Sequence, residues 1–182
     1  MRLKILIGIS GSGKSTWAEN YVRIHPEYHI VSTDQMRKTL LGSESDQSNG
    51  AMIFRNCYEQ IRQHLMNNED VIFDATNLTR KARKEVMSKV SDLPVKFDAV
   101  YFDMPLSKCI LNQEERSRKV PKEVIEKQFN KLTAPDSDEG WDDIFYPYSY
   151  YDDDSTCVIC GAYVPEGTMI CHSCYVKIMS NP

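Results

Sequence analysis

Eight residues near the start of the chain have the types and spacing that bind the phosphates of a nucleotide. Residues 8–15 are Gly-Ile-Ser-Gly-Ser-Gly-Lys-Ser, which matches the pattern G-x-x-x-x-G-K-[ST]. Glycines let backbone N–H groups converge on one anion, and the following helix N-terminus adds partial positive charge. Lys14 is expected to reach the β- and γ-phosphates. The motif predicts binding of ATP or GTP with Mg²⁺, the metal on Ser15 and the nucleotide on Gly11, Ser12, Gly13, Lys14, Ser15 and Thr16.

Two carboxylates and an arginine could complete the chemistry of phosphoryl transfer. Asp74 ends the apolar run of residues 70–74 and could hold Mg²⁺ from the second sphere, or could cap the next turn. Asp34 follows another apolar run and could accept a proton from an acceptor hydroxyl that faces the γ-phosphate. Arg37 lies three residues later on the same helix face and could hold an acceptor phosphate. The alternative is that Asp34 only caps the helix and pairs with Arg37.

A basic turn later in the chain has the composition of a lid over the phosphates. Residues 115–121 are Glu-Arg-Ser-Arg-Lys-Val-Pro and lie between two predicted helices. An arginine on such a turn would neutralise the charge that develops during phosphoryl transfer. We assign this catalytic role to Arg116 and nucleotide binding to Arg118. The alternative is a solvated basic turn with no part in the chemistry.

The elements that must position these residues alternate between strands and helices. Continuous apolar runs predict strands at 3–9, 28–31, 70–74 and 95–102. Helical spacing of apolar residues predicts helices at 14–23, 34–41, 51–66, 79–90, 105–115 and 121–132, with Thr79 as an N-cap. This alternation predicts an α/β fold with a mainly parallel sheet flanked by helices.

These motifs, in this order, resemble the phage-type 5′-polynucleotide kinase domain and its relatives among the P-loop kinases. The matching segments within about residues 1–145 are 11–18, the Asp34-x-x-Arg37 pair, Thr76-Asn77-Leu78, the lid ending in Val120-Pro121, and Glu139-Gly140-Trp141-Asp142. In the phage member an Asp directly precedes the Thr-Asn pair, whereas Ala75 intervenes here. Asp74 could therefore serve either the metal or the acceptor.

The resemblance implies a role for each matching residue. It implies that Asp34 is the general base on a polynucleotide 5′-hydroxyl and that Arg37 contacts the acceptor strand. It also implies that a lid arginine, here Arg116, contacts the transferred phosphate. Thr76 matches a position near the acceptor, and Arg83, on a basic helix, is expected to meet the acceptor strand or ATP.

Four cysteines near the end of the chain have the spacing of a zinc ribbon. They form two C-x-x-C pairs separated by ten residues, Cys157 with Cys160 and Cys171 with Cys174. Four thiolates can close tetrahedrally around Zn²⁺ without an open position, so the site is expected to be structural. The alternatives are disulfides, free thiols, or His172 replacing one cysteine. We therefore predict a P-loop kinase domain at 1–151 and a small zinc ribbon at 152–182.

The net charge of −4 conceals an uneven distribution. Residues 135–156 contain eight acids and no Lys or Arg, whereas residues 1–134 carry a net charge of +4. The overall acidity therefore does not argue against a polyanionic partner. No apolar run is long enough to span a membrane, and we expect a cytoplasmic protein. The resemblance to the phage-type kinases is consistent with a phage-encoded protein.

The sequence therefore favours an ATP-dependent kinase that phosphorylates a nucleic-acid hydroxyl, most simply the 5′-hydroxyl end of DNA or RNA. A second hypothesis keeps the chemistry but uses a hydroxymethylated base in DNA, a nucleoside or a small-molecule alcohol as acceptor. A third hypothesis is a non-catalytic adaptor in which the nucleotide site acts as a switch. The presence of Asp34 favours catalysis, because a switch needs no base for an acceptor.

Overall fold

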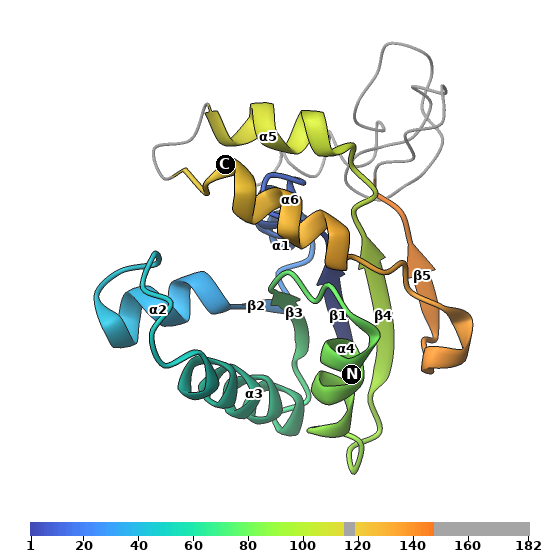
Figure 1. The fold of residues 1–182 in the computed structure, drawn as a ribbon. Coiled ribbons are helices and arrows are strands. Elements are labelled where there is room, and N and C mark those ends of the chain that lie inside the picture. Colours follow the sequence, from blue (N-terminus) through green and yellow to red (C-terminus); the bar gives the residue numbers. More distant parts are fainter. Residues whose placement is uncertain (115–118, 148–182) are drawn as a thin grey trace.

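The computed structural model describes residues 1–114 and 119–147, and these form a parallel sheet flanked by helices (Figure 1). In chain order the elements are β1 (Arg2–Ile7), α1 (Lys14–Ile24), β2 (Tyr28–Ser32), α2 (Thr33–Leu41), α3 (Gly50–Met66), β3 (Asp70–Asp74), α4 (Arg80–Ser88), β4 (Lys96–Tyr101), α5 (Leu106–Glu114), α6 (Lys122–Lys131), a 3₁₀ turn (Ser137–Glu139) and β5 (Asp143–Phe145). The α/β fold predicted from the sequence is confirmed, and the predicted elements agree with these bounds to within two residues at each end.

The sheet has the strand order β2-β3-β1-β4-β5, and every pairing is parallel. Its central strand, β1, is buried on both faces, which explains why its sequence is apolar almost without interruption. Because all strands run the same way, the segments that follow them begin at one edge of the sheet, formed by the carboxyl ends of the strands. Residues that leave β1, β2 and β3 are thereby brought together, although they lie far apart in the sequence.

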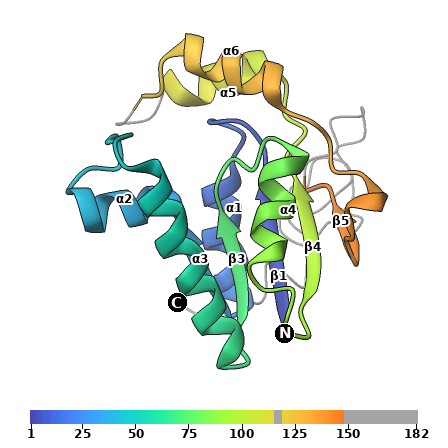
Figure 2. The same ribbon diagram turned by 60° about the horizontal axis from the view of Figure 1, so that its bottom comes forward.

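Helices cover both faces of this sheet. On one face, α3 and α4 bury Ile53, Ile61 and Val86 against the strands. On the other face, α1 buries Trp17 and Ala18. Figure 2 shows α3 and α4 in front of the sheet with α1 behind it. Among the described residues, no helix is long and apolar enough to cross a membrane.

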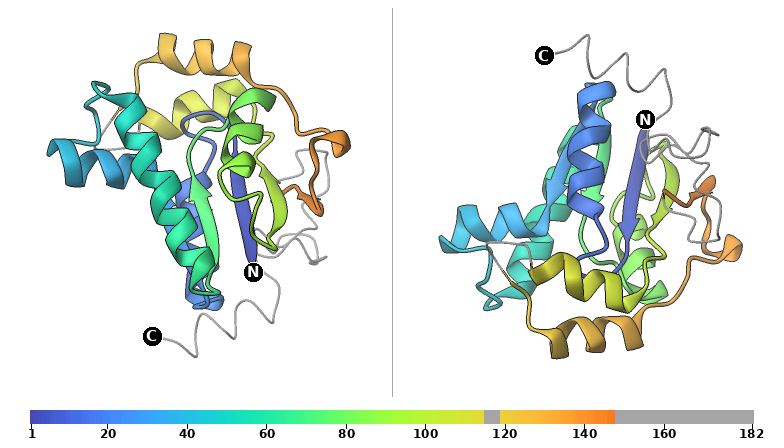
Figure 3. Two further views of the ribbon diagram at one scale, coloured as in Figure 1. Left: turned by 90° about the horizontal axis from the view of Figure 1, so that it is seen from below. Right: turned by 90° about the horizontal axis from the view of Figure 1, so that it is seen from above.

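Helices α5 and α6 lie across the edge of the sheet at which the strands end (Figures 1 and 3). A small apolar cluster holds them there, formed by Ile9 from the loop after β1, Cys109 from α5 and Ile125 from α6. This packing explains why Cys109 is buried, and Cys57 on α3 is buried as well. The pair α5–α6 therefore stands over the loop that carries the phosphate-binding motif.

The acidic segment that begins at residue 135 contributes a strand that the sequence did not predict. Strand β5 is three residues long and pairs with β4 at the edge of the sheet. Asp142 anchors it by accepting the N–H of Phe97 at 2.8 Å, and Phe145 packs in the same cluster as Trp17. A strand this short has no readable alternation of apolar and polar residues. The segment thus packs on the sheet as far as it is described, to residue 147, and the predicted boundary at 151 lies outside the described residues.

Candidate active site

The loop between β1 and α1 has the conformation that its glycines permit. Gly11 and Gly13 have φ angles of 86° and 90°, in the region that side chains disfavour. The Gly8 N–H donates to the carbonyl of Thr76 at 3.0 Å, which ties this loop to the segment after β3. The Lys14 ammonium lies over the loop and donates to the Ile9 carbonyl at 2.7 Å. The loop therefore has the shape of a phosphate cradle at the start of α1.

Asp74 lies at the end of β3 beside this loop. Its side chain is buried, and burial raises the pKa of its carboxyl; Lys14 and a hydrogen bond from the Ser15 hydroxyl oppose that rise. Hydroxyl and carboxylate oxygens are the ligands that Mg²⁺ prefers. Ser15 and Asp74 thus fit a Mg²⁺ ion, because both oxygens already meet at one point next to the cradle. The structure brings together the residues expected from the sequence to hold the metal.

Asp34 and Arg37 lie at the same edge of the sheet. Ser32, the last residue of β2, pairs in register with Asp74, so α2 begins next to the metal-binding residues. Asp34 is close enough that its charge contributes to the raised pKa of Asp74. Its carboxylate accepts from Arg37 at 3.0 Å, with the Asp34 side chain 53% exposed and that of Arg37 10% exposed. The exposed carboxylate therefore stands within electrostatic range of the phosphate site.

The alternative role that the sequence allowed for Asp34 is only partly correct. The helix cap is Ser32, whose hydroxyl accepts the Gln35 N–H at 3.5 Å, and not Asp34. The pairing with Arg37 is present. The Nε of Arg37 is buried and has no hydrogen-bond partner among the described residues, so this guanidinium keeps donor capacity beyond its ion pair.

Helices α5 and α6 bind the phosphate loop directly. On α6, the Gln128 side-chain oxygen accepts the Ser10 N–H at 2.7 Å; on α5, the Asn112 amide donates to the Gly11 carbonyl at 2.8 Å. A Cβ atom at Gly11 would lie 2.2 Å from the Cys109 carbonyl oxygen, so only glycine permits this contact. Sequence analysis missed both amides, because each acts on a residue more than 100 positions away.

The two lid arginines were predicted in the turn that joins α5 and α6. Arg116 and Arg118 lie in residues 115–118, outside the described residues. The same is true of the four cysteines predicted to bind zinc, which fall within residues 148–182. The described chain stops at Glu114 and resumes at Lys119. The helices on either side of these residues contact the phosphate loop.

The expectation that Arg83 meets the acceptor strand or ATP is wrong. Its side chain is fully buried, and its Nε and one terminal nitrogen donate to the Glu139 carboxylate at 2.8 and 2.5 Å. The other terminal nitrogen donates to the Thr133 carbonyl at 3.0 Å. All of these partners belong to the segment that joins α6 to β5. Arg83 therefore holds that segment against α4 and has no free face for a substrate.

Thr76 and Asn77 connect the end of β3 to the phosphate loop. Thr76 provides the carbonyl that holds Gly8, so it lies beside the phosphate loop, and its place near the acceptor stays a prediction. Asn77 is buried in a left-handed conformation, with φ of 45°, and its amide donates to the Leu6 carbonyl at 2.7 Å. Asparagine tolerates this conformation better than most residues. The Asn77 amide thus links the ends of β1 and β3, which is a positioning role that the sequence alone did not reveal.

A family model covers the whole of this site. Residues 3–135 match the model described as AAA domain, which is well over half of the chain. The chain belongs to this AAA domain family. Within the family it is a P-loop kinase-type phosphotransferase domain, and this fold implies the use of ATP and Mg²⁺. The matched region includes the phosphate loop, Asp34, Arg37 and Asp74, and it ends before the cysteine pairs.

The names of relatives of this AAA domain differ in the molecule on which the protein acts. L-seryl-tRNA(Sec) kinase of Methanococcus maripaludis is 26% identical over 153 residues, which is 77% of this chain and 56% of the relative. A chain in the structure of the Pnkp1/Rnl/Hen1 RNA repair complex matches with a TM-score of 0.63 and 26% identity, over 72% of this chain and 43% of that chain. The chain therefore spans about half the length of these two relatives.

A further match shows how widely the fold is shared. A gluconokinase from Sinorhizobium meliloti 1021 matches with a TM-score of 0.53 and 18% identity, over 79% of both chains. At this identity the likeness concerns the fold alone. Because kinases with such different names share this fold, the choice of acceptor has to be argued from the residues of the site.

Proposed function

We propose that this domain transfers the γ-phosphate of ATP to a hydroxyl of a nucleic acid, and most simply to a 5′-hydroxyl end. The observation that carries the proposal is the Asp34–Arg37 pair at the edge of the sheet next to Lys14 and Asp74. An exposed carboxylate at this place can accept the proton of an acceptor hydroxyl. The arginine beside it, whose Nε has no hydrogen-bond partner among the described residues, can bind a phosphate of a polyanion.

In the proposed reaction, the carboxylate of Asp34 accepts the proton of the acceptor hydroxyl. The acceptor oxygen forms a bond to the γ-phosphorus while the bond to the β-phosphate oxygen breaks, so that ADP leaves. Lys14 and the loop amides hold the phosphates in line with the acceptor. Ser15 and Asp74 would hold Mg²⁺, which would neutralise charge on the phosphate oxygens. Arg37 holds the acceptor strand, near Thr76.

The lid would complete the site when nucleotide is bound. We propose that Arg116 contacts the transferred phosphoryl group and that Arg118 contacts ATP. Support comes from the anchoring of both lid helices on the phosphate loop by Asn112 and Gln128. Both helices that flank the turn therefore contact the loop that is expected to hold the phosphates.

Nucleic acid is the favoured class of acceptor for two reasons. Residues 1–134, which contain the phosphate loop and the Asp34–Arg37 pair, carry a net charge of +4, and this local excess of cations favours a polyanion at the site although five further acids bring residues 1–151 to −1. The relatives that are 26% identical have RNA in their names, as a seryl-tRNA kinase and an RNA repair complex. These names describe other proteins. They support the proposed class of acceptor for this chain, and nothing about its partners is taken from them.

The proposal is tested by offering the full chain several acceptors with γ-labelled ATP and Mg²⁺. We expect label on DNA or RNA oligonucleotides with a 5′-hydroxyl and none on the same oligonucleotides that already carry a 5′-phosphate. Nucleosides and DNA with hydroxymethylated bases serve as the alternative acceptors. Label on an internal base or on free nucleosides, with none on 5′ ends, would contradict the proposal. ATP binding without transfer to any acceptor would favour the switch hypothesis.

We also propose that Cys157, Cys160, Cys171 and Cys174 bind one structural Zn²⁺ within a separate ribbon at 152–182. The donor set supports this, because two C-x-x-C pairs provide four thiolates and no open position. Metal analysis of the full chain, loaded with zinc under reducing conditions, is expected to find one equivalent of zinc more than in the variant with Cys157 and Cys174 both changed to Ser. Equal zinc content in the two proteins would contradict the proposal.

A further inference from the structure

Three side chains that can bind a metal meet at the edge of the sheet opposite the phosphate loop. His29 lies near the start of β2, His64 in the last turn of α3, and Glu69 just before β3. Their ligand atoms all lie within 4.8 Å of one another. Asp74 ends the strand that Glu69 precedes, so the cluster lies roughly 16 Å along β3 from the magnesium-binding residues. The cluster therefore takes no part in phosphoryl transfer.

The end of α3 brings Glu69 over His64. The His64 carbonyl accepts the Glu69 N–H at 3.0 Å, and the Leu65 carbonyl accepts the Asn68 N–H at 3.0 Å. With Asn68 at φ 63°, these two bonds make a Schellman motif. That motif commonly places an apolar contact between the two positions that His64 and Glu69 occupy here. The chain instead has an imidazole and a carboxylate there, with a separation of 2.6 Å between Nδ1 and Oε2.

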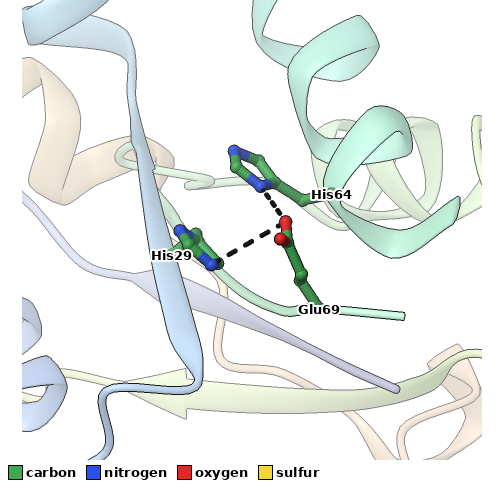
Figure 4. Close-up of side chains that lie close together, drawn as sticks. All are labelled: His29, His64 and Glu69. Carbon is green, nitrogen blue, oxygen red and sulfur yellow. Dashed lines mark hydrogen bonds and ion pairs between the residues drawn. The ribbon is translucent and has the colours of Figure 1, made fainter. Parts of the chain in front are cut away.

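Pairing of β2 with β3 adds the second imidazole. His29 is in register with Val71, which lies two residues after Glu69, and its Nε2 is 3.7 Å from Oε2 of Glu69. The two imidazoles stack with ring centroids 4.5 Å apart and planes 13° from parallel. Figure 4 shows one nitrogen of each ring turned toward the carboxylate between them. Two nitrogens and a carboxylate oxygen from three separate elements thus face one small volume.

These donors suit a first-row transition metal. Imidazole and carboxylate ligands bind Zn²⁺ at about 2.0–2.2 Å, which separates neighbouring ligand atoms by roughly 3.4 Å in a tetrahedron. The separations of 2.6 and 3.7 Å between the imidazole nitrogens and Oε2 of Glu69 bracket that value. The side chains of His29, His64 and Glu69 are 43%, 23% and 37% exposed, so an ion can enter from solvent.

We propose that His29, His64 and Glu69 form a binding site for a divalent transition-metal ion of the Zn²⁺ or Co²⁺ type. The ion fastens the start of β2 and the end of α3 to the start of β3, and water completes its coordination. Mg²⁺ is not the ligand of this site, since two of its three donors are imidazole nitrogens. The site is separate from the phosphate loop, and it shares no residue with the four cysteines predicted to bind zinc.

The chain provides a matched control for this proposal. His25 stacks on Tyr21 with ring centroids 4.3 Å apart, and its Nδ1 is 3.2 Å from a carboxylate oxygen of Glu27. It therefore shares the stacking and the carboxylate of the proposed site, but it belongs to no group of three metal-binding side chains among the described residues. A change of His25 to Phe removes a histidine with similar surroundings and no expected metal.

The test is a titration of the full chain with Co²⁺ under reducing conditions, followed by visible absorption. Cobalt on the cysteines gives thiolate-to-metal charge-transfer absorption in the near ultraviolet, whereas cobalt on His29, His64 and Glu69 gives ligand-field absorption without it. We expect wild type and His25→Phe to bind one equivalent more than His29→Phe or His64→Phe, whose phenylalanines preserve ring stacking. Glu69→Gln is expected to weaken that equivalent by at least about tenfold.

Two results would overturn the proposal. One is that the phenylalanine variants at His29 and His64 bind as many equivalents as wild type. The other is that all bound cobalt shows thiolate charge transfer, which would place every ion on cysteine. If a phenylalanine variant does not fold, as judged by circular dichroism, Glu69→Gln decides the matter, because an unchanged affinity in that variant also contradicts the site. None of these measurements depends on kinase activity.

Discussion

Changing Asp34 to Asn is expected to lower the rate of phosphoryl transfer by about two to four orders of magnitude, the range for loss of a general base. The amide is nearly the same size as the carboxylate but cannot accept the proton of the acceptor hydroxyl. Asp34 does not belong to the phosphate loop, so the affinity for ATP should change little. Single-turnover transfer from γ-labelled ATP, together with equilibrium binding of ATP, measures both quantities on the same protein.

The control for this prediction removes a different surface carboxylate. Asp92 makes an exposed ion pair with Arg62 at 2.6 Å, on elements that do not contribute to the phosphate site. Asp92→Asn is therefore expected to leave the transfer rate unchanged. If Asp34→Asn transfers phosphate as fast as Asp92→Asn, Asp34 is not the base. In that case the exposed carboxylate only orients Arg37, and the proposed mechanism fails.

Changing Arg83 to Met is expected to lower the free energy of unfolding by about 3–5 kcal/mol, the cost of leaving one charge of a buried ion pair without its partner. Methionine fills much of the space but leaves the Glu139 carboxylate unpaired in the interior. It also removes the donor that holds the Thr133 carbonyl. Urea unfolding followed by circular dichroism measures the loss, provided that the transition is two-state.

The same helix offers a matched control for the loss of a buried charge. Arg80 pairs with Asp138 at 2.8 Å, but both side chains are exposed, at 43% and 64%. Exposed pairs contribute at most about 1 kcal/mol, so Arg80→Met is expected to change stability by no more than that. Equal losses in the two variants would contradict the structural role of Arg83. Adding Glu139→Leu to Arg83→Met is expected to restore part of the stability, because no buried charge then remains.

The sequence predicted a residue's place correctly where that place depends on residues close to it in the chain. The phosphate loop could be predicted because its glycines, lysine and serine are consecutive and the neighbouring strand and helix have clear apolar patterns. Asp34 and Arg37 could be paired because three residues along a helix is one turn. Thr79 could be named as a cap, and its hydroxyl accepts the Ala82 N–H at 3.2 Å.

The basic helix shows where local reasoning failed. Four cations among residues 80–84 suggested a surface for a polyanion, and a sequence does not distinguish an exposed cation from a buried one. Arg83 is buried because Glu139, 56 residues later, is delivered to it by the segment before β5. Strand β5 itself was missed for a related reason, since its stability comes from pairing with β4 and packing on Trp17, and not from its own three residues.

The sequence by itself determined the class of fold, the place of the phosphate loop and the pair of residues that faces it, because these depend on periodicity and on short-range spacing. Only the tertiary structure decided what the side chains meet across long separations. It placed Arg83 in the interior, fastened Gln128 and Asn112 to the phosphate loop, and gathered His29, His64 and Glu69 at the opposite edge. Those outcomes depend on burial and on strand register, which arise when distant segments pack together and leave no signal in neighbouring residues.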